Sequence, residues 1–334
     1  MNNKKTILIT GGIGFVGSHS VEHLLKNTDW DIIILDGMNY AANVDRVYES
    51  KYWDATRVKF IWHDLRSPIS ETLHNNIGPL NYIWHYASES HVDKSLEDCI
   101  PFISSNVLGT ANLLEYIKRF QPGIERVLIF STDEVFGPAP EGVYYKEDDR
   151  FKPSNPYAAA KAGEEMIAFS FAHAFRIPIS IVRSMNIIAE KQHPEKFLPK
   201  TIRATLNNEP ITLHSTDGKF SSRCWIHARN VADGMLFLTD KAETEQFYHI
   251  VGEERTVFDI ANIVFKTLTG RDMTEKDYTA LDAHSQRPGH DFRYALSGKK
   301  LQDMGWEPPK KLEESLIKAI KWYLLPENKK WLNI

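Results

Sequence analysis

The stretch Thr6-Ile7-Leu8-Ile9-Thr10-Gly11-Gly12-Ile13-Gly14-Phe15-Val16-Gly17 decides the fold of this chain. Its first five residues form an apolar, β-branched run that predicts a buried strand, and the residues from Phe15 onward have helical spacing. Between the two, Gly11, Gly14 and Gly17 let the backbone turn tightly and approach a pyrophosphate at the helix N-terminus. The stretch therefore predicts a strand, turn and helix that bind a dinucleotide.

An acidic residue follows this turn at the distance that a dinucleotide site requires. Asp36 ends the second predicted strand, where its carboxylate can accept hydrogen bonds from both ribose hydroxyls and would repel a 2′-phosphate. NAD is therefore favoured over NADP. Asp64 ends the third predicted strand at the same edge of the sheet, and there an adenine contact and an ordinary turn residue are both open interpretations.

Strand and helix patterns alternate through the first half of the chain, which indicates βαβ units around a parallel sheet. We predict a doubly wound, Rossmann-type α/β sheet with strands at 6–10, 31–36, 59–64, 82–87, 126–131 and 179–183 and helices near 15–27, 67–76, 101–120 and 157–174. Beyond residue 186 the elements are shorter and punctuated by proline and glycine. The expected domains are an NAD-binding Rossmann domain at 1–186 and a smaller mixed α/β substrate-binding lobe at 187–334, with some segments returning to the first domain.

A tyrosine and a lysine share one face of the predicted helix that starts at Ser154-Asn155-Pro156. Tyr157 and Lys161 are four residues apart, so the ammonium can lie near the phenol and favour its deprotonated form. A phenolate can take a proton from a hydroxyl group while a hydride leaves the same carbon. This spacing also occurs by chance, so its weight comes from its position after the fifth predicted strand.

That fifth strand ends in a polar cluster, Ser131-Thr132-Asp133-Glu134, at the edge where open α/β sheets carry their reactive groups. Two adjacent acids can divide acid and base work if their surroundings separate their pKa values. An exposed turn is the alternative interpretation. Beside the glycine turn and the Tyr157/Lys161 pair, we favour catalysis.

The composition excludes several other classes of protein. The chain has 334 residues, is 42% hydrophobic and 25% charged, and carries a net charge of −4, which does not fit a nucleic-acid binder or a disordered chain. No apolar run is long enough to span a membrane. The two cysteines, Cys99 and Cys224, predict neither a disulfide framework nor a metal site. We expect a cytoplasmic protein without a metal, a nucleic-acid partner or a membrane partner.

Taken together, these residues resemble the extended short-chain dehydrogenases/reductases, and among them the dTDP-glucose 4,6-dehydratase family of nucleotide-sugar 4,6-dehydratases. The stretches that carry the resemblance are 11–17, Asp36 with 40–43, 89–93, 106–110, 131–137, 154–161, 194–196, 287–291 and 305–308. The resemblance implies NAD contacts from Gly11, Gly14, Phe15, Val16, Gly17, Asp36, Asp64, Leu65, Ala87, Ser105, Tyr157 and Lys161. It implies nucleotide-sugar contacts from Ser90, Thr132, Asn186, Lys196, Arg223, Arg287 and His290.

The resemblance also implies a reaction in which an NDP-glucose, carrying dTDP or UDP, becomes the NDP-4-keto-6-deoxyglucose. Tyr157, assisted by Lys161 and Thr132, removes the C4 hydroxyl proton as hydride passes to NAD. Glu134 then abstracts the C5 hydrogen, Asp133 protonates the departing C6 hydroxyl, and the hydride returns to C6. Deoxysugar biosynthesis, such as that of rhamnose, is the usual destination of this chemistry.

Some positions depart from the family pattern, and they leave alternatives open. The stretch Asn186-Ile187-Ile188-Ala189-Glu190 keeps only the first residue of the usual run, and His214 occupies the place of a tyrosine expected beneath the base. The nucleotide and the hexose therefore stay open. An NAD-dependent UDP-sugar 4-epimerase or decarboxylase is the nearest alternative, which Asp133 disfavours, and a non-catalytic NAD-binding sensor is a more distant one. The predicted helices near 101–120 and 157–174 resemble those that pair subunits, so a homodimer is expected.

Overall fold

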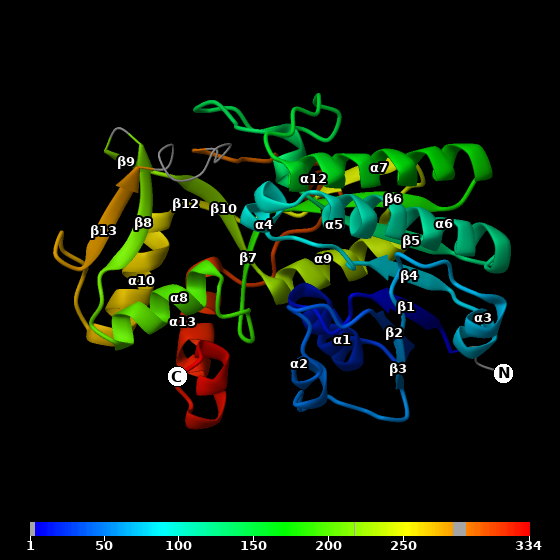
Figure 1. The fold of residues 1–334 in the computed structure, drawn as a ribbon, viewed down its shortest axis with the longest axis horizontal. Helices are drawn as coiled ribbons and strands as arrows, with labels where there is room; N and C mark the ends of the chain where they lie inside the picture. The colour runs from blue at the N-terminus through cyan, green and yellow to red at the C-terminus, as the bar shows by residue number, and fades with distance from the viewer. Residues whose placement is uncertain (1–3, 217, 283–291) are drawn as a thin grey trace.

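The computed structural model describes residues 4–216, 218–282 and 292–334. Its largest element is a seven-stranded sheet of order β11-β6-β5-β4-β1-β2-β3, in which every neighbouring pair is parallel (Figure 1). The strands are β1 (Thr6–Thr10), β2 (Asp31–Asp36), β3 (Val58–Trp62), β4 (Tyr82–His85), β5 (Arg126–Thr132), β6 (Ile179–Ser184) and β11 (Gln246–His249). The strand order reverses between β1 and β4, and ligands of open α/β sheets bind beyond the carboxyl ends at such a point.

Helices cover both faces of this sheet because alternate residues of each buried strand point to opposite sides. Ile7 and Ile9 belong to a buried cluster with residues of α1 (Phe15–Asn27) and α9 (Ala228–Lys241). Leu8 belongs to a second cluster, with residues of α6 (Gly109–Phe120) and α7 (Pro156–Phe175). The helix α3 (Glu71–Ile77) adds to the second face. The two clusters are the cores of a doubly wound domain.

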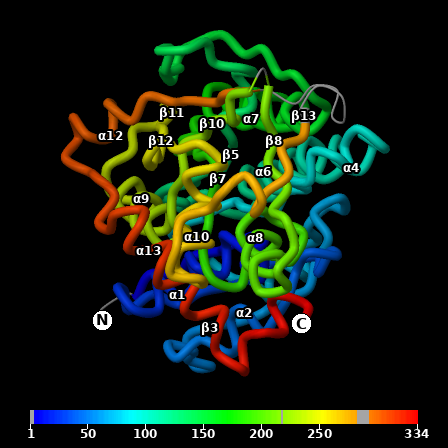
Figure 2. Tube along the Cα trace, turned by 90° about the vertical axis from the view of Figure 1, so that its left-hand side faces the viewer, coloured from blue at the N-terminus to red at the C-terminus, as the bar shows by residue number. Residues whose placement is uncertain are grey.

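A smaller lobe lies at the other end of the molecule, on the left in Figure 1 and toward the viewer in Figure 2. It has two three-stranded sheets, of order β12-β10-β7 and β13-β8-β9, and a buried core of its own. Its elements are β7 (Asn186–Ile188), α8 (Phe197–Leu206), β8 (Ile211–Thr216), β9 (Lys219–Phe220), β10 (Ser222–His227), β12 (Glu253–Thr256), α10 (Val257–Thr269), β13 (Tyr278–Asp282), α13 (Leu312–Tyr323) and η3 (Pro326–Leu332).

Short elements connect these layers. They are α2 (Asp45–Tyr48), α4 (Val92–Glu97), α5 (Ile100–Phe102), the π-helical segment η1 (Ile103–Leu108), η2 (Asp133–Phe136) and α12 (Lys299–Asp303). None of the helices in the described part of the chain is long and apolar enough to cross a membrane.

The predicted fold class is confirmed, and the differences lie in single elements. The strand predicted at 82–87 ends at His85, because its partner β1 ends at Thr10, the residue paired with His85. The helix predicted from residue 67 begins at Glu71, where Ser70 caps it by accepting a hydrogen bond from the Leu73 N–H. The helix predicted at 101–120 contains the π-helical segment η1.

The seventh strand was not predicted. β11 has only four residues, and it pairs with β6 although more than sixty residues separate the two in sequence. With α9 it brings residues 228–249 back to the large sheet. The division at residue 186 stays a prediction.

Candidate active site

A cavity of about 960 Å³ lies between the large sheet and the smaller lobe. It is lined by the glycine turn, the carboxyl ends of β2, β4 and β5, the N-terminus of α7, and parts of β7, α8 and β8. The predicted site residues that line it are Gly11, Gly14, Phe15, Val16, Gly17, Asp36, Asp64, Leu65, Ala87, Ser90, Ser105, Thr132, Asp133, Glu134, Tyr157, Lys161, Asn186, Lys196 and Arg223. Arg287 and His290 lie outside the described residues.

The backbone of the glycine turn is packed too closely for side chains at Gly11 and Gly17. A Cβ on Gly11 would lie 2.7 Å from the backbone nitrogen of Ala87, and a Cβ on Gly17 would lie 2.2 Å from the carbonyl oxygen of Gly11. Helix α1 then begins without a side-chain cap at Gly14. The N–H groups of such a first turn are available to an anion, so the turn fits the pyrophosphate of a dinucleotide.

Asp36 is held beside this turn by backbone donors. The Ile13 N–H donates to its Oδ2 over 3.2 Å, and the Met38 N–H donates to its Oδ1 over 2.8 Å. Burial raises the pKa of Asp36, although the two N–H groups oppose that shift. Asp64, in contrast, already pairs with Arg66, whose hydrogen bonds lower the pKa of Asp64.

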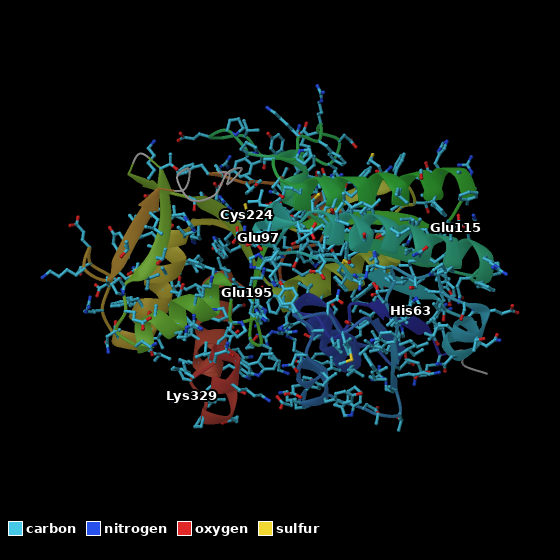
Figure 3. The ribbon with its side chains drawn as sticks, viewed as in Figure 1. His63, Glu97, Glu115, Glu195, Cys224 and Lys329 are labelled. Carbon is cyan, nitrogen blue, oxygen red and sulfur yellow. The ribbon has the colours of Figure 1, made fainter. Side chains whose placement is uncertain are left out.

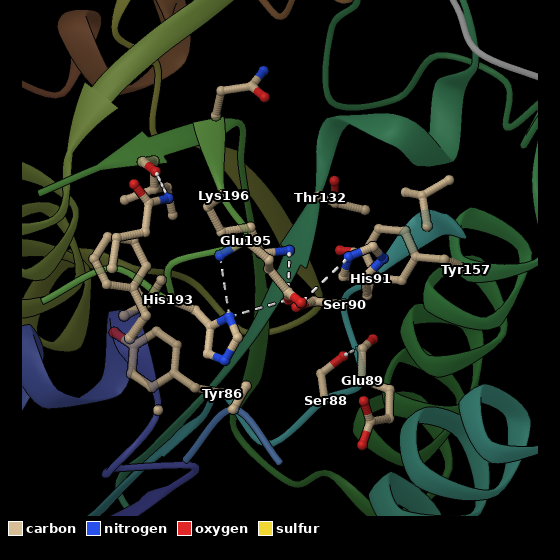
Figure 4. A pocket seen from close by; sticks show the side chains of 18 of the residues that line it. Tyr86, Ser88, Glu89, Ser90, His91, Thr132, Tyr157, His193, Glu195 and Lys196 are labelled. Atoms are coloured by element: carbon tan, nitrogen blue, oxygen red, sulfur yellow. Dashed lines mark hydrogen bonds and ion pairs between the residues drawn. The ribbon is translucent and has the colours of Figure 1, made fainter. Parts of the chain in front are cut away.

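The hydroxyl of Thr132 is hydrogen-bonded to both predicted catalytic acids. Its Oγ1 donates to Asp133 Oδ1 over 3.0 Å and accepts from the Glu134 N–H over 3.3 Å, and Thr132 also opposes the rise in the pKa of the Tyr157 phenol. Thr132 and Tyr157 both line the cavity and are labelled in Figure 4. Burial, aided by the charge of Glu134, raises the pKa of Asp133 to about 7. Asp133 can therefore carry a proton near neutral pH, as a general acid must.

Asn155 holds the second acid in place, a role that its sequence pattern does not predict. Its Oδ1 caps α7 by accepting from the Ala158 N–H over 2.8 Å, while its Nδ2 donates to Glu134 Oε2 over 2.9 Å. One side chain thus ties the start of the Tyr157 helix to the carboxylate after β5. The helix-start pattern Ser154-Asn155-Pro156 was the available signal, but it predicts only the cap.

The expected effect of Lys161 on Tyr157 stays a prediction, and burial has the largest influence on the pKa of the phenol. Burial raises the pKa of Tyr157 well above its usual value, and the carboxylate of Glu134 adds to this shift. The Lys161 ammonium donates to the carbonyl oxygen of Phe130 over 2.8 Å and to Glu164 Oε2 over 2.7 Å. The Lys161 ammonium is therefore hydrogen-bonded to acceptors in the interior, and burial has the largest effect on the pKa of the Tyr157 phenol.

Glu195 is a second residue to which no role was given. It lies between the two parts of the molecule in Figure 3, and dashed lines in Figure 4 join it to its neighbours. Its Oε1 accepts from the Tyr40 hydroxyl over 3.0 Å, and its carboxylate lies 3.6 Å from His91 and from His193. Tyr40 and His91 follow strands of the large sheet, so Glu195 ties the smaller lobe to that sheet across the cavity mouth.

The cationic side chains of the smaller lobe reach the same cavity. Arg223 is buried, donates to the carbonyl oxygens of Ser222 and Phe292 over 2.7 Å each, and stacks 4.8 Å from the Tyr294 ring centre. Lys196 lies at the start of α8, 3.9 Å from Glu195. In the described part of the chain, no group of three or more His, Cys, Asp or Glu side chains could hold a metal ion.

A parallel Rossmann sheet with a glycine turn, a Tyr-x-x-x-Lys pair and a Thr-Asp-Glu cluster at one cavity defines an NAD-dependent 4,6-dehydratase of the extended short-chain dehydrogenase/reductase class. The sequence profile described as GDP-mannose 4,6 dehydratase matches residues 8–319, and the chain belongs to this family. NAD is the cofactor, and the glycine turn with Asp36 fits it.

Individual relatives support this assignment. The chain is 32% identical to the low-salt glycan biosynthesis protein Agl12 of Haloferax volcanii, over 95% of this chain and 98% of that protein. It is 33% identical to a trifunctional UDP-glucose 4,6-dehydratase, 3,5-epimerase and reductase of Arabidopsis thaliana, over 98% of this chain but only 48% of that protein. A structure of the dTDP-glucose 4,6-dehydratase DesIV of Streptomyces venezuelae, with NAD and TYD bound, superposes with a TM-score of 0.86 at 31% identity, covering 98% of both chains.

Proposed function

We propose that this protein converts dTDP-glucose or UDP-glucose to the corresponding 4-keto-6-deoxy sugar. The observation that carries the proposal is the Asp133–Glu134 pair at the end of β5, beside Tyr157, with the pKa of Asp133 raised to about 7 by burial. Relatives that act on dTDP-glucose and on UDP-glucose support both nucleotides equally. The cations Lys196 and Arg223, which line the cavity, suit a diphosphate.

The proposed roles follow from position. Bound NAD would supply the acceptor for the C4 hydride and the donor of the same hydride to C6. Tyr157 takes the proton of the C4 hydroxyl, and Thr132 helps by lowering the pKa of its phenol. Glu134, held by Asn155, removes the C5 proton that the new ketone makes acidic, and Asp133 gives its proton to the departing C6 hydroxyl. When the hydride reaches C6, Glu134 returns its proton to C5, so each turnover leaves Tyr157 with one proton more and Asp133 with one fewer, and Thr132 is hydrogen-bonded to Asp133.

Product mass tests this function directly. The purified protein is incubated with dTDP-, UDP-, CDP- and GDP-hexoses without added cofactor, and each product is weighed by mass spectrometry. We expect the dTDP- or UDP-glucose product to lose the mass of one water, because the hydride is returned within each turnover. Heat-denatured protein is the control. A product of unchanged mass would indicate epimerisation, loss of carbon dioxide from a uronic acid would indicate decarboxylation, and no product would indicate an NAD-binding sensor.

We also propose that the protein is a homodimer that pairs through α5, η1 and α7. Large apolar side chains are exposed on these neighbouring elements, with 62% exposure at Ile100, 47% at Ile103, 49% at Leu108 and 44% at Met166. Such surfaces mark interfaces when they cluster. Light scattering should give twice the chain mass, and Ile100→Glu should shift the protein toward monomer. A monomer at micromolar concentration would contradict the proposal.

A cytoplasmic location is the accompanying proposal. Cys99 and Cys224 are both free thiols, which persist in reducing compartments. Fractionation of the source cells would place the protein with cytoplasmic markers, and recovery with exported markers would contradict it.

A further inference from the structure

Helix α7 places two consecutive carboxylates, Glu164 and Glu165, completely inside the protein. They have different partners. Glu165 forms a bidentate ion pair with Arg183, with a shortest nitrogen–oxygen distance of 2.7 Å. Glu164 instead accepts from the Lys161 ammonium over 2.7 Å, one helical turn back and at the wall of the active-site cavity. A buried charge costs free energy unless it is paired, and each of these carboxylates is paired with a different cation.

The geometry around Lys161 explains what Glu164 does there. An ammonium has three N–H donors. One donates to the carbonyl oxygen of Phe130 over 2.8 Å and a second to Glu164 Oε2 over 2.7 Å, and both acceptors belong to the interior. Lys161 is itself 3% exposed. Two fixed acceptors define the orientation of the ammonium, and the third N–H is left for the cavity.

The opposite side of Glu164 is closed by a neutral histidine. Glu164 Oε1 is buried without a hydrogen-bond partner and lies 3.9 Å from His85 Nε2. His85 is held by Thr10 Oγ1 over 2.6 Å and by Thr110 Oγ1 over 2.8 Å, and burial lowers the pKa of His85 to about 3. His85 therefore supplies no positive charge, and Lys161 is the cation that Glu164 holds.

We propose that Glu164 is a positioning residue for Lys161, which it orients so that one N–H faces the bound cofactor and Tyr157. This inference rests on the proposed function, in which Lys161 acts at those groups. Glu164 has a second effect through its charge. Burial raises the pKa of Glu164 to about 7, against the opposing charge of Lys161 and aided by that of Glu165. In turn, Glu164 adds to burial and to the charges of Glu134 and Asp133 in raising the pKa of Tyr157.

Two substitutions separate orientation from charge. Glu164→Gln keeps an acceptor oxygen for Lys161 but removes the charge, whereas Glu164→Leu removes both. Glu165→Gln is the matched control, since it lies on the same helix and is equally buried but pairs with Arg183. Leaving the Arg183 charge buried and unpaired should lower the unfolding temperature without altering Lys161.

Three measurements on the protein with its cofactor bound test the idea. They are the release rate of fluorescent reduced cofactor on chase with excess NAD, the pH profile of turnover, and the thermal unfolding temperature. We expect Glu164→Leu to release cofactor about 10-fold faster and to lose about 10-fold in kcat, because a charge-assisted hydrogen bond to the cofactor is misplaced. We expect Glu164→Gln to keep the release rate and to move the acid limb of the profile about half a pH unit lower, because it removes a negative charge near Tyr157.

The pH dependence of stability gives a further test of the role of Glu164. The pKa of Glu164 in the fold is above its ordinary value, so this carboxyl group loses stabilising influence as the pH rises from the ordinary pKa to about 7. Glu164→Gln should therefore unfold no earlier than the wild type at about pH 8, where Glu165→Gln unfolds earlier. The proposal would be overturned if both Glu164 variants released cofactor at the wild-type rate and kept the wild-type pH profile. It would also be overturned if Glu165→Gln showed the faster release or the shifted profile expected of the Glu164 variants. If the wild type turns over no sugar, the proposed function fails, and cofactor release still decides the role of Glu164.

Discussion

Replacing Asp133 with asparagine should leave sugar oxidation in place but slow water loss, so that reduced cofactor accumulates in a single turnover. Asp133 is buried, and burial with the nearby charge of Glu134 raises its pKa to about 7, so it holds a transferable proton at neutral pH. Asparagine has the same shape, and its oxygen can still accept from Thr132, but it cannot protonate a leaving hydroxyl. We expect elimination to slow by about 10²- to 10⁴-fold. Rapid mixing with absorbance and product mass would measure both steps.

The matched control for this variant is Asp303→Asn, which removes an acid from the exposed end of α12 and should change neither step. Because elimination requires the proton on Asp133, we also expect the elimination rate to depend on pH. Because the acid must be protonated and its pKa is about 7, the wild-type elimination rate should fall as the pH rises through about 7. Equal slowing of oxidation and elimination in Asp133→Asn would contradict the assigned role.

Replacing Tyr157 with phenylalanine should stop the reaction one step earlier, so that no reduced cofactor forms. The phenol is the proposed acceptor of the C4 hydroxyl proton, and removing a general base costs about 10²- to 10⁴-fold in rate. The ring itself is buried against Phe102, at a centroid distance of 6.4 Å, and this packing is kept by phenylalanine. We therefore expect the free energy of unfolding to change by about 1 kcal/mol or less. Single-turnover absorbance with dTDP- or UDP-glucose measures the rate.

Tyr116→Phe provides the comparison for that experiment. Tyr116 is also buried on a helix of the same face of the sheet, and its hydroxyl is hydrogen-bonded to Gln121 over 2.6 Å, away from the cavity residues. It should lose a similar amount of stability and keep full turnover. Reduced cofactor forming at a near wild-type rate in Tyr157→Phe would show that another group accepts the proton.

Much of the site was predictable because its parts are local in sequence. The glycine turn requires only neighbouring residues, as does the placement of Asp36, Asp133 and Glu134 at strand ends. Tyr157 and Lys161 needed only the helical repeat. Every described residue predicted for the site lines the same cavity, because parallel strands bring their carboxyl ends to one edge.

The contacts that join distant segments were not predictable in this way. Strand β11 is short, and it is stabilised by β6 rather than by its own pattern. Glu195 meets Tyr40 and His91 only after the lobes fold together, and Asn155 meets Glu134 across more than twenty residues. No spacing rule connects such positions.

The amino-acid sequence by itself determined the class of fold and the dinucleotide turn, since short-range backbone geometry sets these, and its resemblance to the family implied the proposed acid, base and tyrosine. Only the tertiary structure decided how those groups ionise. Burial, which depends on the whole packed chain, raises the pKa values of Asp133 and Tyr157. The same packing places Glu164 in the interior, where it accepts a hydrogen bond from Lys161. The cost of placing charge in a low-dielectric interior is the physical reason, and it arises only after folding.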